Sequence, residues 1–386
     1  MKLFAAAIAV TALGLPAAQA SSPATVPGLV YTPGYGNSIV MRYDPMTLAR
    51  TGPRVRLGGN ASSWSWSPRR RYLAVASYPQ QLTIVEMAGM GVVSRVRLGP
   101  GGASVRAVTW VRDRVLAVVE TPRGAVVTAV DPFAGRVVRR TQLSRPFTFE
   151  FARLPDGLVL LLGSLGRLTP AQIAVVDADG ATRIATVRQV AVGTVVQGGR
   201  GVHRAPGLAV DPLGRQAYLV DGDRLVGVDL RTLAVSDPGP LRTLAKVSRG
   251  SSRSARWLGG GLLAFSGHDW GTAARVGLRI VDVHERTARV VDAGASSFTV
   301  AERMLVVENA PSRRALNVAA YGFGGRLRYR VELAWATWLK KQGRIGYACR
   351  DAFLRATVDL ATGRTLRSRF PAGTRCPTLL VDDSRG

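Results

Sequence analysis

The sequence predicts an all-β protein, a β-propeller built from a repeated four-stranded unit. A strand, a short polar turn and a second strand recur eight times, about 38 to 53 residues apart, which is the length of a four-stranded propeller blade. Val and Leu are frequent in short apolar or alternating runs, and beyond the N-terminal segment no stretch keeps helical spacing over three turns. The clearest copy runs from Leu225 to Val235 around Asp229.

One residue opens the tight turn in each copy and locates it. Six of these eight residues are Asp, whose short side chain can accept hydrogen bonds from backbone N–H groups two residues further on. We therefore predict a structural role for them and no catalytic one. The eight positions are Asp44, Glu86, Asp131, Asp177, Asp229, Asp282, the degenerate Tyr321, and Asp359.

Each copy can be expanded into four short strands. In the second copy these strands are predicted at 63–66, 72–76, 82–86 and 92–98. The stretches 66–75 (WSPRRRYLAV) and 207–220 (GLAVDPLGRQAYLV) resemble the blade signatures of bacterial YVTN-type and WD-like β-propellers. The resemblance implies a propeller over nearly all of the chain after the N-terminal segment, and because such folds host many functions it implies no particular activity.

The two ends of the chain predict how the ring closes. The first copy has three evident strands, at 29–32, 39–43 and 55–57, and a spare strand at 378–381 follows the last copy. Together they would complete one blade and leave no open sheet edge in the ring. We expect eight blades, or seven if the copy at Tyr321 is not a blade of its own.

The N-terminal segment has the composition of a secretory signal peptide. Lys2 precedes an apolar run that ends in the small-residue sequence AQA at 18–20. We expect residues 1–20 to be removed on export and residues 21–386 to form a single extracytoplasmic β-propeller domain, soluble and monomeric. No later run of about 20 apolar residues could span a membrane.

Two cysteines, Cys349 and Cys376, are the only ones in the chain. An even pair in an exported protein predicts a disulfide, whereas a redox pair would favour C-x-x-C spacing. The bridge would clamp the last copy next to the closing strand.

The chain is strongly basic, with a formal net charge of +27. Of its 52 Lys and Arg residues 48 are Arg, the residue suited to forked contacts with phosphate and carboxylate. Because no nucleic-acid-binding motif is present, an anionic glycan, a cell-envelope polyanion or a protein is a more natural partner than DNA.

No catalytic motif is found, and the catalytic residues, if any, are unknown. A zinc-protease motif would need a second His after His284 and Glu285, and neither a G-x-S-x-G elbow nor a P-loop is present. We predict no cofactor, and a divalent metal only under the alternative of a metal-dependent hydrolase or lactonase.

Unequal spacing of the copies points to a candidate binding site. The fifth and sixth copies carry extra residues, placed by the sequence in long loops at 193–206, 242–256 and 266–275 on one face of the ring. A carboxylate, an aromatic ring and several guanidiniums suit a carbohydrate or anionic ligand. The candidate residues are His203, Arg204, Arg249, Arg253, His268, Asp269 and Trp270.

Three functions remain open at this stage. The leading interpretation is an exported propeller that binds or scaffolds, with recognition on this loop face. The hydrolase alternative would use a channel metal, or His203, His268 and Asp269 as metal ligands. A structural envelope-assembly role would need a protein partner.

Overall fold

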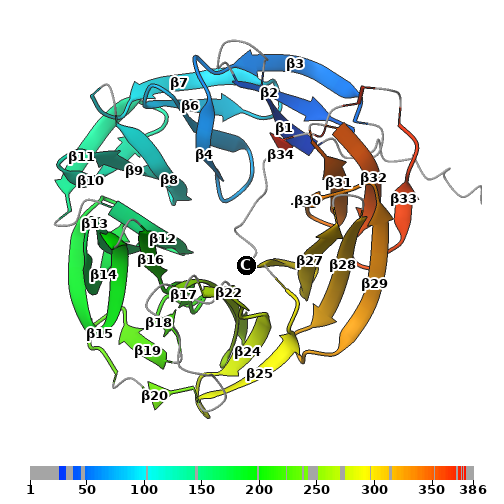
Figure 1. Ribbon diagram of the computed structural model, residues 1–386. Helices are drawn as coiled ribbons and strands as arrows, with labels where there is room; N and C mark the ends of the chain where they lie inside the picture. Colours follow the sequence, from blue (N-terminus) through cyan, green and yellow to red (C-terminus); the bar gives the residue numbers. More distant parts are fainter. Residues whose placement is uncertain are drawn as a thin grey trace, which may run out of the picture.

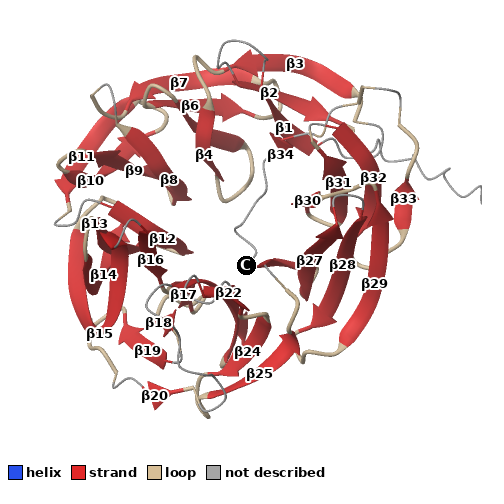
Figure 2. Cartoon of the chain, in the orientation of Figure 1, coloured by secondary structure: helices blue, strands red, loops and turns tan. Residues whose placement is uncertain are grey.

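The computed structural model describes a ring of β-sheets around a central axis, with the strands of each sheet stacked one after another from the axis to the rim (Figure 1). The described residues are 26–31, 38–44, 48–100, 103–143, 147–197, 200–222, 224–236, 239–241, 251–269, 274–295, 297–312, 315–351, 353–370, 373–374, 376 and 378–379. All regular elements among them are strands (Figure 2). No helix in this part of the chain could cross a membrane. The predicted signal peptide, 1–20, lies outside the described residues.

Six sheets have four strands each, in antiparallel order. The first three contain β3 (Arg50–Arg56), β2 (Ser38–Tyr43), β1 (Val26–Tyr31) and β34 (Thr378–Leu379); β4 (Ala61–Trp66), β5 (Tyr72–Ser77), β6 (Gln81–Glu86) and β7 (Gly91–Arg97); and β8 (Ser104–Val111), β9 (Arg114–Thr121), β10 (Gly124–Asp131) and β11 (Arg136–Gln142). The others contain β17 (Gly207–Val210), β18 (Gln216–Asp221), β19 (Arg224–Asp229) and β20 (Gly239–Pro240); β26 (Ser297–Ala301), β27 (Met304–Ser312), β28 (Ala315–Gly322) and β29 (Leu327–Ala334); and β30 (Trp338–Gln342), β31 (Ile345–Arg350), β32 (Phe353–Asp359) and β33 (Thr365–Arg367).

The seventh sheet has ten strands and joins two parts of the ring. It contains β12 (Phe147–Leu154), β13 (Gly157–Leu165), β14 (Leu168–Asp177), β15 (Thr182–Gln197), β16 (Arg200–Ala205), β21 (Ser251–Gly259), β22 (Leu262–Asp269), β23 (Ala274–Arg275), β24 (Leu278–Asp282) and β25 (Thr287–Asp292). The four-strand meanders β12–β15 and β21-β22-β24-β25 are linked through β16, which pairs with β15 and β21.

The expected long loops in this region are largely strands. The described residues of 193–206 form most of a hairpin between β15 and β16. In the stretch predicted as a loop at 266–275, residues 266–269 continue β22 and residues 274–275 form β23, which pairs with β22; residues 270–273 lie outside the described residues. Within 242–256, residues 251–256 belong to β21, and 242–250 lie outside the described residues. The correction has a physical reason, since backbone groups in these extensions find partners in neighbouring strands.

Strands from the two ends of the chain pair as predicted. Leu29 of β1 lies opposite Thr378 of β34, and Gly28 lies opposite Leu379. The disulfide between Cys349 on β31 and Cys376 is also present, with 5.9 Å between the two Cα atoms. Both features lie at the closure of the ring.

The predicted turn role is confirmed for six of the seven recurring carboxylates, and the turn that follows Asp44 lies outside the described residues. Asp229 accepts hydrogen bonds from the backbone N–H groups of Arg231 (2.9 Å) and Thr232 (2.7 Å). Equivalent backbone bonds are accepted by Glu86, Asp131, Asp177, Asp282 and Asp359. In the degenerate copy the Tyr321 hydroxyl instead donates to Asp292 of the preceding sheet, at 2.7 Å.

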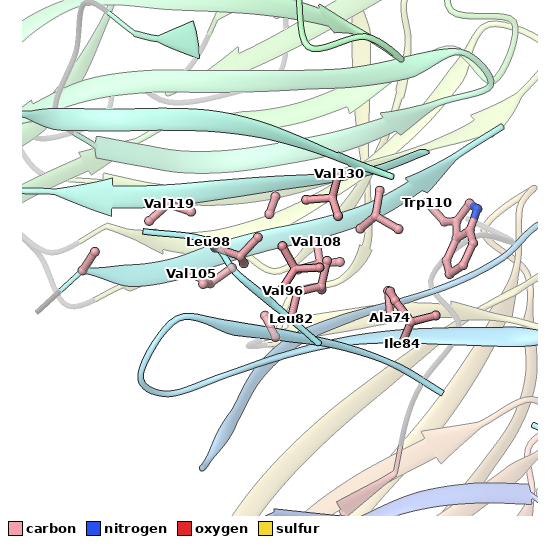
Figure 3. Close-up of a cluster of buried hydrophobic side chains, with 14 residues drawn as sticks. Ala74, Leu82, Ile84, Val96, Leu98, Val105, Val108, Trp110, Val119 and Val130 are labelled. Atoms are coloured by element: carbon pink, nitrogen blue, oxygen red, sulfur yellow. The ribbon is translucent and has the colours of Figure 1, made fainter. Parts of the chain in front are cut away.

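The core lies between neighbouring sheets. In Figure 3, Leu82 and Ile84 of β6 pack with Val108 of β8 and Val119 of β9, and all four are fully buried or nearly so. Polar links join successive sheets at the rim, where the Thr141 hydroxyl donates to the Gly180 carbonyl (2.8 Å). Each sheet is therefore stabilised mainly by its neighbours.

Removing the disulfide should destabilise the ring closure. We expect the Cys349→Ser, Cys376→Ser double variant to lose about 3 kcal/mol of unfolding free energy, because the bridge restricts a loop of 27 residues in the unfolded chain. Urea unfolding of the oxidised protein and of the variant measures this. An unchanged midpoint would contradict it.

Stability should fall in acid. Bonds from the Arg344 side chain hold the pKa of Asp359 far below its usual range, and turn N–H bonds from Ala134 and Thr232 lower the pKa of Asp131 and Asp229. A carboxylate with a lowered folded-state pKa stabilises above the unfolded-state pKa of about 4 and loses that effect as the pH falls towards its folded-state pKa. We expect the urea midpoint to drop below about pH 4, with a smaller drop in Asp359→Asn.

Candidate functional site

Strand pairing brings the ends of β16, β21 and β22 together. Arg204 of β16 lies opposite Ser251 of β21 in a parallel pair, and Ser251 lies opposite Asp269 of β22 in an antiparallel pair. Residues far apart in the sequence thus become neighbours. We call the side chains of Arg204, Asp221, Arg253, Asp269 and Arg279 the strand-end cluster.

Arg204 makes a forked ion pair with Asp221, the last residue of β18. Its Nε donates to Oδ1 at 3.0 Å and its Nη2 to Oδ2 at 2.7 Å. The Asp221 side chain is 1% exposed, whereas that of Arg204 is 29% exposed. The pair therefore fixes β16 on the neighbouring sheet while part of the guanidinium still reaches the surface.

Arg253 is a buried guanidinium with incomplete hydrogen bonding. The residue is 3% exposed, and its Nη1 donates to the carbonyl oxygens of Ser252 (3.0 Å) and His268 (2.8 Å). Its Nε has no hydrogen-bond partner among the described residues. Burial lowers the pKa of Arg253, while the charges of Asp269 and Asp221 oppose this effect.

A glycine allows Arg253 to lie where it does. Gly267 of β22 is opposite Arg253, and a Cβ at position 267 would lie 2.0 Å from the Ser252 carbonyl oxygen and 3.0 Å from the Arg253 Cα. Any larger residue would therefore push β21 and β22 apart.

Positive charge exceeds negative charge in the strand-end cluster. Arg279 of β24 adds a third guanidinium, whose Nε donates to the Val276 carbonyl (3.1 Å) and whose pKa is lowered by burial. Asp221 and Asp269 supply two carboxylates against the three guanidiniums. The described part of this region is thus suited to a further negative group.

His203 lies apart from the cluster. It precedes Arg204 on β16, so its side chain points to the other face of the strand. The Nδ1 atom lies 3.0 Å from the Thr194 hydroxyl, and the ring stacks on Phe149 at 5.6 Å. Burial lowers its pKa, which favours the neutral form.

The structure places four of the seven predicted site residues near one another, and their role in ligand binding stays a prediction. Arg204, Arg253, His268 and Asp269 are brought together, whereas Arg249 and Trp270 lie outside the described residues. In the described ranges no group of three or more His, Cys, Asp or Glu side chains could hold a metal ion, so His203, His268 and Asp269 do not form the metal set considered above.

Asp221 and Arg279 were missed by sequence reasoning. Asp221 precedes Gly222 at the end of an apolar strand and reads as an ordinary turn residue. Nothing local marks Asp221, because its partner Arg204 lies in another strand, and Arg279 joins the cluster only because β24 pairs with β22.

A carboxyl group also lies on an innermost strand of the ring. Burial raises the pKa of Glu150 on β12, and the charges of Arg256 on β21 and Arg106 on β8 oppose this shift. β12 and β21 each begin one of the two meanders of the ten-stranded sheet, and β8 begins a four-stranded sheet, so all three side chains come from first strands. A lone carboxyl is insufficient to define a hydrolytic site.

No protein-family model matches the sequence, and no curated protein matches it. Solved structures do resemble the fold. The protein described as "Dihydro-heme d1 dehydrogenase NirN in complex with DHE" aligns with a TM-score of 0.62 and 13% identity over 92% of this chain and 73% of that one. BamB from Moraxella catarrhalis aligns with a TM-score of 0.50 and 14% identity over 85% and 93%.

The computationally designed Ika8 protein aligns with a TM-score of 0.52 and 8% identity over 84% of this chain and 93% of that one. NirN and BamB are β-propellers, and the likeness supports that fold here. At such low identity it carries no activity across to this chain.

The Arg204–Asp221 pair should contribute more stability than an exposed pair of the same type. We expect Asp221→Asn to cost about 2 kcal/mol or more, because it leaves a half-buried guanidinium without its carboxylate. Asp156→Asn is the control, since the Arg112–Asp156 pair is 64% and 68% exposed and should contribute clearly less because water screens it. Equal losses in urea unfolding would contradict this ranking.

Proposed function

We propose that this chain is an exported, eight-bladed β-propeller that binds an anionic ligand at the strand-end cluster and so serves in binding or scaffolding. The observation that carries the proposal is Arg253, a buried guanidinium whose Nε has no described hydrogen-bond partner, in a cluster with excess positive charge. A carboxylate, sulfate or phosphate group would supply the missing acceptor.

The count of eight rests on the sheet topology. Six sheets have four strands each, and the ten-stranded sheet contains two further four-strand meanders. The copy at Tyr321 has its own sheet, β26–β29, which favours eight blades over seven. The YVTN-type or WD-like character of the blades remains an interpretation of the two blade-signature stretches.

Export is supported by the composition of residues 1–20 and by the disulfide. A Cys349–Cys376 bridge persists in an oxidising compartment and is uncommon in the cytosol. We infer that residues 21–386 act outside the cytoplasm as one domain.

The ligand is proposed to be an acidic sugar of a glycan or another cell-envelope polyanion. Arg204 retains an exposed portion beside Arg253, so an anionic group could contact both guanidiniums. His268 and Asp269 belong to the proposed binding set, as do Arg249 and Trp270, which lie outside the described residues, whereas His203, on the other face of β16, does not.

Calorimetric titration with glucuronate, with glucose as its neutral counterpart, tests the proposal. We expect glucuronate to bind and glucose not to bind, and Arg253→Gln to weaken glucuronate binding about tenfold or more, because a charged hydrogen bond is lost. Arg256 is exposed and lies on the same strand as Arg253, so Arg256→Gln removes the same charge and should leave binding unchanged.

Equal binding of glucose and glucuronate by the unaltered protein, or no binding of either, would refute the anionic site even if Arg253→Gln failed to fold. Elemental analysis after dialysis distinguishes the binding function from the hydrolase alternative, because the hydrolase is expected to retain about one divalent ion per chain. Retention of such an ion would redirect the search to ester and lactone substrates.

A further inference from the structure

A second surface feature lies on the last sheet, away from the strand-end cluster. A groove of about 690 Å³ opens between the start of β32 and the segment that follows β33. We propose that this groove binds an extended acidic segment of a partner protein that carries an aromatic or aliphatic side chain between its carboxylates. The lining residues are Phe353, Leu354, Arg355, Ser368, Arg369, Phe370, Gly373 and Thr374.

The groove exists because β33 is short. It pairs with β32 only at Thr357 and Val358, so the half of β32 that begins at Phe353 has no neighbouring β33 residue. Among its described residues, the chain beyond β33 returns to this strand where the Leu354 N–H donates to the Thr374 carbonyl at 3.0 Å. The space between these two contacts is the groove.

Both walls of the groove are anchored. Leu354 and Phe370 belong to or pack against the buried cluster around Tyr347 and Cys349. The disulfide from Cys349 to Cys376 ties the returning segment to β31. A preformed groove costs a ligand less ordering entropy than one that must form on binding.

The lining combines aromatic rings with cations. Phe353 is 39% exposed, and the Arg367 guanidinium lies 4.8 Å from the centre of the Phe370 ring. Arg355 and Arg369 are exposed, and neither has an ion-pair partner among the described residues. No lining residue is acidic.

An aromatic and cationic strip extends from the groove. Arg350 lies opposite Phe353 in the β31–β32 hairpin, and its guanidinium is 5.5 Å from the centre of the Trp335 ring. Trp335 is 53% exposed, in the turn before β30. Asp351, which pairs with Arg350 at 3.9 Å, is the acidic residue next to this strip.

These features favour a protein segment over a simple polyanion. Exposed aromatic and Arg side chains are the residues that most often dominate protein–protein binding energy. The incompletely covered strand edge suits an extended peptide, which can add main-chain hydrogen bonds while its side chains alternate between the rings and the guanidiniums. A sulfated or phosphorylated polymer would use only the cations.

Fluorescence anisotropy with a labelled hexapeptide of alternating Asp and Phe tests the proposal on the full mature protein. We expect binding that weakens about tenfold or more in the Arg355→Gln, Arg369→Gln double variant, because two charged contacts are lost. Phe353→Ser should weaken it severalfold. The matched control is Arg140→Gln with Arg188→Gln, two exposed outer-strand changes with the same charge loss.

Three outcomes would overturn the proposal. The first is no binding of the Asp–Phe peptide by the unaltered protein. The second is equal binding when Ser replaces Phe in the peptide, or equally tight competition by heparin, which would indicate a general polyanion surface. The third is an equal loss in the control variant, which would indicate an effect of net charge. None of these results depends on the glucuronate experiment.

Discussion

The pairing of β34 with β1 is the constraint on which the rest of the molecule depends. A ring of sheets packed face to face buries its apolar side chains only if the first and last sheets also meet. Strands from both ends of the chain complete one sheet, and the disulfide holds the returning segment beside it. Closure gives every sheet two neighbours, so a short strand or a weak turn in one copy is supported from both sides.

Both candidate binding surfaces lie where the repeat is broken. Around β16 the strands are longer than the repeat requires, and their ends pair across the ten-stranded sheet and gather guanidiniums and carboxylates. At the last sheet β33 has three residues, fewer than most of the other outer strands, and leaves a groove. In the regular copies the polar side chains form turns and links between sheets. Departures from the repeat are where side chains become available for other roles.

Local features were predicted well from the sequence, and the predictions that failed are instructive. The turn at Asp229 is set by hydrogen bonds to residues two and three positions away, so its sequence is sufficient to recognise it. The loops predicted at 193–206 and 266–275 are mainly paired strands, because alternating residues in an extension look the same whether or not a partner strand exists.

The sequence by itself determined the all-β class, the turn residues, the pairing of the terminal strands and the Cys349–Cys376 bridge. Each of these depends on short-range patterns or on an unambiguous choice of partners. The tertiary structure alone decided the parallel contact of β16 with β21, the burial of Asp221 against Arg204 and the incomplete covering of β32. Those features join segments distant in the chain, and no periodicity in either segment encodes the identity of its partner.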